Sequence, residues 1–83
     1  MGLFGSNAIK CPICEKPLPK SEVRMNGGHW AQHIDEIPSG ELAGRYTWVC
    51  SCGPAPMHWP ERMGALCGLV LHLGQRHGID AFG

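Results

Sequence analysis

Eight cysteine and histidine residues stand in four closely spaced pairs along a chain of only 83 residues. The pairs are Cys11/Cys14, His29/His33, Cys50/Cys52 and His72/His77. A chain this short buries too little apolar surface to fold on hydrophobicity alone, so we expect disulfide bonds or a bound metal ion to stabilise it. Zinc in structural sites takes four thiolate or imidazole ligands at the corners of a tetrahedron. Four pairs supply two complete ligand sets, and we therefore predict zinc binding, with two ions rather than one.

Metal binding is favoured over disulfides by the cysteine count and by the start of the chain. Five cysteines cannot all pair within one molecule, and the first ten residues are too polar for a secretory signal. We therefore expect a cytoplasmic or other reducing compartment, where thiols stay available for metal. The remaining cysteine, Cys67, is interpreted as a small core residue. No stretch is long and apolar enough to predict a membrane span, so we expect no membrane partner.

The clearest secondary-structure pattern predicts a largely buried helix from Pro60 to about Arg76. Apolar residues recur there at three- and four-residue steps, and Gly78 follows as a stop signal. The recurring residues are Met63, Leu66, Cys67, Val70 and Leu73. Upstream, in "RYTWVCSCG", Tyr46, Trp48, Cys50 and Cys52 occupy alternate positions, as residues on one face of a strand do. Asn26-Gly27 is a strong turn signal. Residues 29–37 fit either a short helix or a strand.

These elements predict a small, zinc-stabilised α+β fold with short β-hairpins and one long C-terminal helix. We expect residues 1–8 to form a flexible leader, residues 9–44 a first zinc-binding unit, and residues 45–83 a second, finger-like unit. The two units are expected to pack as one domain, because neither is long enough to bury a core alone.

Taken in chain order, each cysteine pair shares an ion with the histidine pair that follows it. In the second set, "LVLHLGQRHGI" after Cys50 and Cys52 resembles the two-cysteine, two-histidine ββα zinc fingers. The resemblance implies that His72 and His77 reach from the helix back to the two thiolates. The Cys-x-Cys spacing is tighter than in that family, and the following 19-residue gap is longer. The insertion "GPAPMHWP" absorbs the excess.

The first set departs further from this family, because Gly27 and Gly28 stand directly before His29. If residues 29–33 formed a strand, His29 and His33 would lie roughly 13 Å apart and could not share an ion. A second pairing follows from that possibility. "CPIC" and "CSCG" together resemble the two knuckles of a zinc ribbon, in which all four thiolates hold one ion.

A third resemblance concerns "HWAQHIDEIPSG", which is similar to the core of HNH nucleases when flanked by cysteine pairs. It implies His33 as general base and His77 or His58 as a late metal ligand. That family has an acidic ligand directly before the base, where this chain has Gln32. We therefore expect no enzyme, and interpret His58, beside Trp59, as an exposed or packed side chain.

The charge balance bears on the class of partner. The formal net charge is zero and no basic run occurs, whereas strong sequence-independent nucleic-acid binding needs concentrated positive charge. We expect a non-catalytic recognition module that contacts a protein partner or a second copy and regulates a larger complex. The alternative, a nucleic-acid-binding finger, draws on the finger resemblance, on three tryptophans and on basic residues early in the chain. These are Lys10, Lys16, Lys20 and Arg24.

Overall fold

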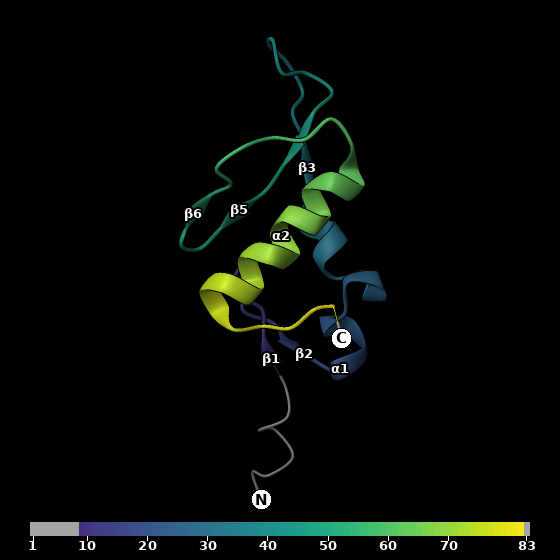
Figure 1. Ribbon diagram of the computed structural model, residues 1–83, viewed down its shortest axis with the longest axis vertical. Helices are drawn as coiled ribbons and strands as arrows, with labels where there is room; N and C mark the ends of the chain where they lie inside the picture. The colour runs from purple at the N-terminus through teal and green to yellow at the C-terminus, as the bar shows by residue number, and fades with distance from the viewer. Residues whose placement is uncertain (1–8, 83) are drawn as a thin grey trace, which may run out of the picture.

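The computed structural model describes residues 9–82, and the predicted leader at 1–8 lies outside them. Figure 1 shows one long helix crossing a set of short strands and helical turns. In chain order the elements are β1 (Ile9–Lys10), β2 (Pro17–Leu18), α1 (Lys20–Val23), the 3₁₀ helices η2 (Met25–Gly27) and η3 (Trp30–His33), β3 (Asp35–Glu36), β4 (Tyr46–Thr47), β5 (Val49–Cys50), β6 (Gly53–Pro54) and α2 (Arg62–His77). The predicted small α+β fold with short hairpins and one C-terminal helix is confirmed.

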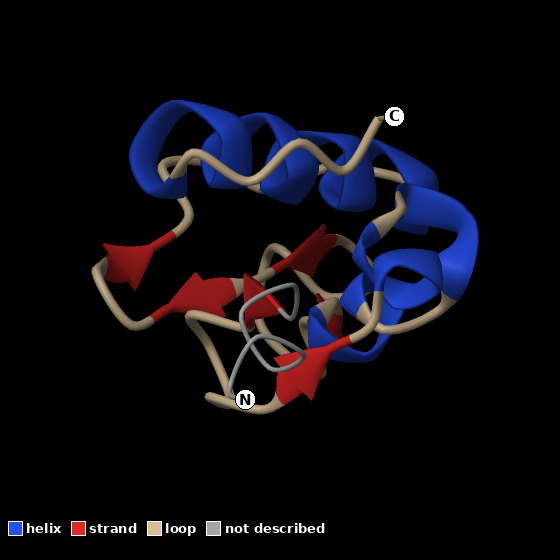
Figure 2. Cartoon of the chain, turned by 90° about the horizontal axis from the view of Figure 1, so that it is seen from below, coloured by secondary structure: helices blue, strands red, loops and turns tan. Residues whose placement is uncertain are grey.

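The strands of residues 9–82 form three separate antiparallel pairs, β1–β2, β3–β4 and β5–β6, each two residues long on each side. Pro17 and Pro54 stand in two of the six strands, and a proline cannot donate to a ladder, which keeps these pairs short. Figure 2 shows α2 along one side of the molecule and the strand pairs along the other. The strands therefore act mainly as turns that present side chains toward α2.

Helix α2 begins at Arg62, two residues after the predicted start, because Glu61 is still extended at φ −129° and ψ 147°. It ends where the sequence predicted. Gly78 adopts the left-handed conformation at φ 67°, and the N–H of Ile79 donates to the carbonyl of Leu73 at 3.1 Å. Such a glycine-terminated turn satisfies the last helical carbonyls and lets the chain reverse. The C-terminal residues then run back along the helix (Figure 1).

One face of α2 forms the centre of the core, with Ala65, Leu66, Leu69, Val70 and Leu73 all buried. Trp30 and Trp48, at 0% and 1% exposure, are the largest fully buried side chains of the described residues. The cluster of buried residues runs from Cys11 to Ala81. It is continuous along the described chain because α2 contacts both η3 and β4.

Two apolar residues of α2 are exposed, although the sequence predicted a largely buried helix. Met63 is 59% exposed, although the periodicity placed it on the buried face. Arg62 in the same turn is also exposed, and its guanidinium donates to the carbonyls of Ala31 and Ile34 at 3.3 and 3.4 Å. Leu71 is 53% exposed because it lies on the side of the helix opposite the core. The helix therefore keeps an apolar outer surface.

Candidate metal centres

The first candidate centre begins in the tight turn between β1 and β2. The N–H of Glu15 donates to the carbonyl of Cys11 at 2.8 Å, and Glu15 itself is left-handed at φ 65°. The N–H groups of Ile13 and Cys14 approach the sulfur of Cys11 at 3.4 and 3.5 Å. Backbone donors aimed at a sulfur favour its thiolate form and hold a ligand in place. The turn thus presents Cys11 and Cys14 as one preorganised pair.

The backbone of Gly28 sets the position of the histidine pair. Gly28 is left-handed at φ 95°, a conformation that ends η2 and starts a new short helix. His29 stands at the N-terminus of η3 and His33 at its last residue, so their rings fall on one side of a single turn. Their Nε2 atoms lie 3.3 Å apart. The helical alternative for residues 29–33 is therefore correct, and the 13 Å separation expected of a strand does not arise.

Each of these histidines meets one cysteine. Nε2 of His33 lies 3.6 Å from Sγ of Cys11, and Nε2 of His29 lies 3.6 Å from Sγ of Cys14. With zinc–sulfur bonds of about 2.3 Å and zinc–nitrogen bonds of about 2.0–2.1 Å, a tetrahedron has S···N edges of about 3.6 Å and N···N edges of about 3.3–3.4 Å. The three distances match these edges, so the cluster has the dimensions of a tetrahedral zinc site.

The second centre joins the β5–β6 turn to the last turns of α2. Sγ of Cys50 lies 3.3 Å from Nε2 of His77, and Sγ of Cys52 lies 3.2 Å from Nε2 of His72. These edges are a few tenths of an ångström shorter than those of a tetrahedral zinc site, so an ion would spread the pairs slightly. The His72 ring also packs against Trp48, with centroids 4.9 Å apart. The buried core therefore fixes one of the ligands.

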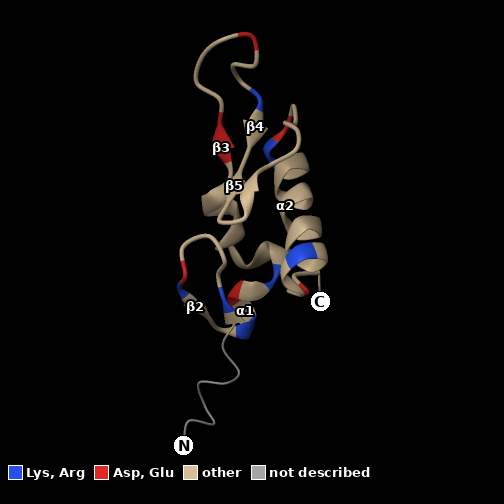
Figure 3. Ribbon diagram, turned by 90° about the vertical axis from the view of Figure 1, so that its left-hand side faces the viewer, with Lys and Arg blue, Asp and Glu red and all other residues tan. Residues whose placement is uncertain are grey.

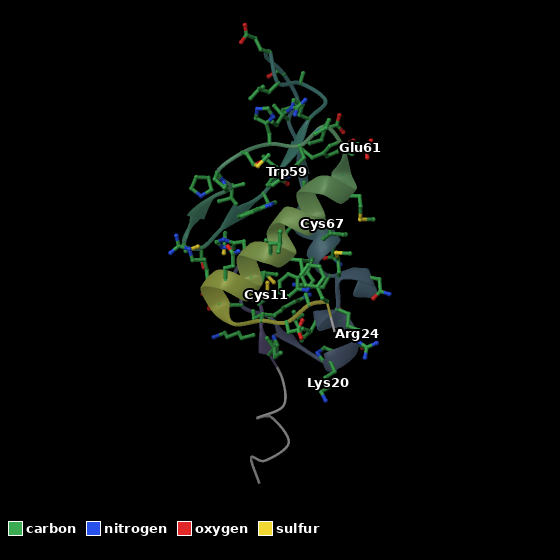
Figure 4. All side chains as sticks on the ribbon, in the orientation of Figure 1. Cys11, Lys20, Arg24, Trp59, Glu61 and Cys67 are labelled. Carbon is green, nitrogen blue, oxygen red and sulfur yellow. The ribbon has the colours of Figure 1, made fainter. Side chains whose placement is uncertain are left out.

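Figure 4 draws the side chains as sticks and labels Cys11 of the first centre. In both centres the ligand atoms all lie within 4.8 Å of one another. No further His, Cys, Asp or Glu of residues 9–82 joins either group. Each centre pairs one buried cysteine with one exposed cysteine, Cys11 with Cys14 and Cys50 with Cys52. Each cluster therefore has the composition to hold one metal ion with four protein ligands.

Burial sets the protonation of these groups before metal binds. Desolvation lowers the pKa of His29 and His33, and for His33 the neighbouring His29 adds to the effect. Desolvation also lowers the pKa of His72, with His77 and Arg76 contributing. These imidazoles are therefore neutral at neutral pH, the form that binds metal.

The thiols shift in the opposite direction. Desolvation raises the pKa of Cys11, against the smaller influence of the backbone N–H groups that face its sulfur. The pKa of Cys52 is raised too, by desolvation and then by the hydrogen-bonded thiol of Cys50, while Arg76 acts weakly in the other direction. A metal ion must therefore displace thiol protons when it binds.

The structure groups the eight predicted residues in chain order, each cysteine pair with the next histidine pair. Cys11 and Cys14 stand in a different cluster from Cys50 and Cys52, so the grouping does not fit a ribbon in which four thiolates share one ion. His58 belongs to neither cluster, and its Nδ1 accepts from Nε of Arg45 at 2.5 Å.

Cys67, which the sequence predicted as a small core residue, is half-buried and belongs neither to the buried core cluster nor to a metal cluster. The backbone donors at Cys11 and the charge of Arg76 near Cys52 were not predicted. Neither a main-chain N–H nor an arginine four positions after a helical histidine has a sequence signature as a partner of a metal ligand.

Comparisons with protein families, with curated proteins and with solved structures find no match to this chain. The resemblance to zinc fingers therefore rests on the two clusters alone. Within residues 9–82, no helix has the length and apolar character needed to cross a membrane.

Proposed function

We propose that this chain is a non-catalytic module in which two structural zinc ions organise a surface that recognises a protein partner and so regulates a larger complex. The observation that carries the proposal is the pair of clusters, each with two thiolates and two imidazoles within 4.8 Å of one another. Four protein ligands complete a tetrahedron around zinc and leave no open position for water. A closed coordination shell favours a structural ion over a catalytic one, and the buried positions of Cys11 and Cys50 support it.

Zinc serves this fold as a substitute for a larger core. The strand pairs are two residues long and α1 has four residues, so neither is stable without tertiary support. The first ion joins the β1–β2 turn to η3, and the second joins the β5–β6 turn to α2. Metal binding then supplies much of the folding free energy, as in small zinc domains generally.

A protein partner is favoured over a nucleic acid by the distribution of charge. Two acidic residues stand among the four basic ones at the β1, β2 and α1 end of the molecule (Figure 3), and Lys10 forms an ion pair with Glu15 at 3.8 Å. A phosphate-binding surface needs several unopposed cations. The outer side of α2 instead exposes Met63 and Leu71, at 59% and 53%, which is typical of a surface that binds protein.

The number of bound ions tests the metal part of the proposal. Native mass spectrometry of the purified chain is expected to show two zinc ions. Cys14→Ser should leave only the second ion and His72→Ala only the first, while the control His58→Ala should keep both. A single ion that survives both histidine changes, His33→Ala and His72→Ala, would contradict the proposal and favour the four-thiolate ribbon.

Binding assays test the recognition part. We expect the zinc-loaded chain to capture a protein partner from extract that has been treated with nuclease. The His72→Ala variant, which lacks the second ion, should no longer capture it. Tight binding to duplex or single-stranded DNA with a steep salt dependence would instead favour a nucleic-acid-binding finger. Magnesium- or manganese-dependent DNA cleavage that His33→Ala abolishes would favour the nuclease.

A further inference from the structure

A hollow among the described residues lies between the β5–β6 hairpin and the outer side of α2. It has a volume of about 600 Å³, within the usual range for ligand pockets. Trp59, Pro54 and Pro56 line one side, and Leu71 and Arg76 of α2 line the other. Its far end reaches the second metal centre through Cys52 and His72. The hollow therefore combines an apolar wall, a cation and a metal-stabilised edge.

Two tryptophans form part of the apolar wall. Trp48 and Trp59 are stacked, with ring centroids 6.1 Å apart and an angle of 21° between the planes. Trp59 is only half-buried and rests against Gly64 and Gly68 of α2. An aromatic wall flanked by prolines presents rigid apolar area that loses little conformational entropy when a ligand covers it.

Trp48 adds a polar group that lacks a partner. The residue is 1% exposed, and its Nε1 is the one buried side-chain nitrogen or oxygen of the described residues without a hydrogen bond. Buried donors are nearly always paired, so an orphan of this kind calls for a partner supplied from elsewhere. Trp48 is itself one of the residues that line the hollow, which places its indole beside a ligand bound there.

The charge of the hollow selects the kind of ligand. A centre of two thiolates, two imidazoles and one zinc ion is formally neutral. Arg76 is then the one full charge among the residues that line the hollow. A cation beside an apolar wall is complementary to a carboxylate that neighbours an apolar side chain.

We propose that this hollow binds a short extended segment of a partner protein in which a carboxylate stands next to apolar residues. The carboxylate pairs with Arg76, an apolar side chain packs on Trp59 and Leu71, and a backbone carbonyl accepts from Nε1 of Trp48. The inference rests on the proposed recognition function and assigns it a surface. A second hollow of about 300 Å³ shares Leu71 with the first and continues past Asp80 to Phe82.

The test uses the zinc-loaded full chain and two probe peptides. One is a six-residue acetylated and amidated peptide of leucine, proline and glutamate, and the other has lysine in place of each glutamate. In ¹H–¹⁵N spectra the glutamate peptide is expected to shift the indole N–H signals of Trp48 and Trp59. The Trp30 signal should not move, because its N–H already donates to the carbonyl of Val23 at 2.6 Å. The lysine peptide should shift none of the three.

Variants locate the binding surface. Arg76→Glu is expected to weaken binding of the glutamate peptide at least tenfold, and Lys20→Glu, at the opposite end of the molecule, should leave it unchanged. Leu71→Ser removes an exposed side chain without disturbing the core and should also weaken binding. A zinc count of two verifies that each variant is folded.

Several results would overturn the inference. The first is a failure of the glutamate peptide to bind at millimolar concentration, and the second is equal binding of both peptides. The others are signal shifts confined to other residues, and stronger binding of a single-stranded oligonucleotide that shifts the same signals. If the peptide fails while zinc-dependent capture of a partner persists, the recognition function stands and only this surface is wrong. If capture fails as well, the proposed function itself fails.

Discussion

The indole of Trp59 lies directly against Gly68 of α2, so closely that a β-carbon on Gly68 would stand 2.7 Å from Cη2 of Trp59. The next glycine of the helix differs. A β-carbon on Gly74 would meet no atom closer than the carbonyl oxygen of Ile79, at an ordinary 3.7 Å. The two glycines therefore have opposite uses, since the first admits a tryptophan and the second only weakens the helix.

Alanine at these two positions should change stability in opposite directions. Gly68→Ala is expected to lower the free energy of unfolding by about 1–3 kcal/mol, because the added carbon overpacks Trp59. Gly74→Ala should raise it by about 0.5–1 kcal/mol, because alanine is the better helix former. Urea unfolding of the zinc-loaded proteins measures both values. Equal effects of the two changes would show that Trp59 does not pack on Gly68.

The left-handed backbone of Gly28 supports the first metal centre. No atom lies within 4 Å of a β-carbon built there, so Gly28→Ala adds strain without a clash. Left-handed backbone costs a residue with a β-carbon about 1–2 kcal/mol, which predicts roughly tenfold weaker zinc binding at the first centre. Gly28→Asn should recover part of the loss, because asparagine tolerates this conformation better.

Competition with a chelator measures the effect of Gly28. The second centre is the internal control, since its ligands come from β5, the β5–β6 turn and α2, and its affinity should not change. If Gly28→Ala and Gly28→Asn release zinc alike, or if the second centre weakens equally, the local explanation is wrong.

The two histidine pairs show which parts of the metal centres could be predicted from the sequence and which could not. His72 and His77 follow from helical periodicity and a glycine stop, both local signals, so their place beside Cys50 and Cys52 could be predicted. His29 was ambiguous, because residues 29–33 suited a helix and a strand equally well. The outcome depends on the backbone of Gly28 and on the burial of Trp30, which are tertiary effects.

The exposed face of α2 also lay beyond prediction. An apolar stripe of Met63, Leu66 and Val70 fits a buried surface by period alone. In the structure Met63 is exposed, and the first turn contacts η3 through Arg62, whose hydrogen bonds to the carbonyls of Ala31 and Ile34 have no sequence signature. The contact of Trp59 with Gly68 could not be predicted from the sequence either. It depends on how closely the tryptophan of a proline-rich loop fits against the helix, which no local pattern indicates.

Two buried tryptophans differ in one hydrogen bond, and their phenylalanine variants should differ in stability. Trp30→Phe leaves the carbonyl of Val23 without its donor, which adds about 1–3 kcal/mol to the cost of the smaller ring. Trp48→Phe removes a donor that has no partner, so it lacks this added cost. We expect Trp30→Phe to be the less stable variant in urea unfolding at saturating zinc. The reverse order would mean that Trp48 has an acceptor in solution.

Metal uptake is expected to release about two protons per zinc ion near pH 7.5, hence about four for the whole chain. Desolvation raises the pKa of Cys11, and that of Cys52 is raised as well, so the thiols hold their protons until zinc displaces them. The pKa values of His29, His33 and His72 are lowered, so these imidazoles release few protons when zinc binds.

Because zinc binding releases protons, the affinity for zinc rises with pH and falls on acidification. Calorimetry in two buffers of different ionisation enthalpy counts the protons, and Cys14→Ser, which disables the first centre, should halve the number. A count near zero would show that zinc does not bind through thiolates.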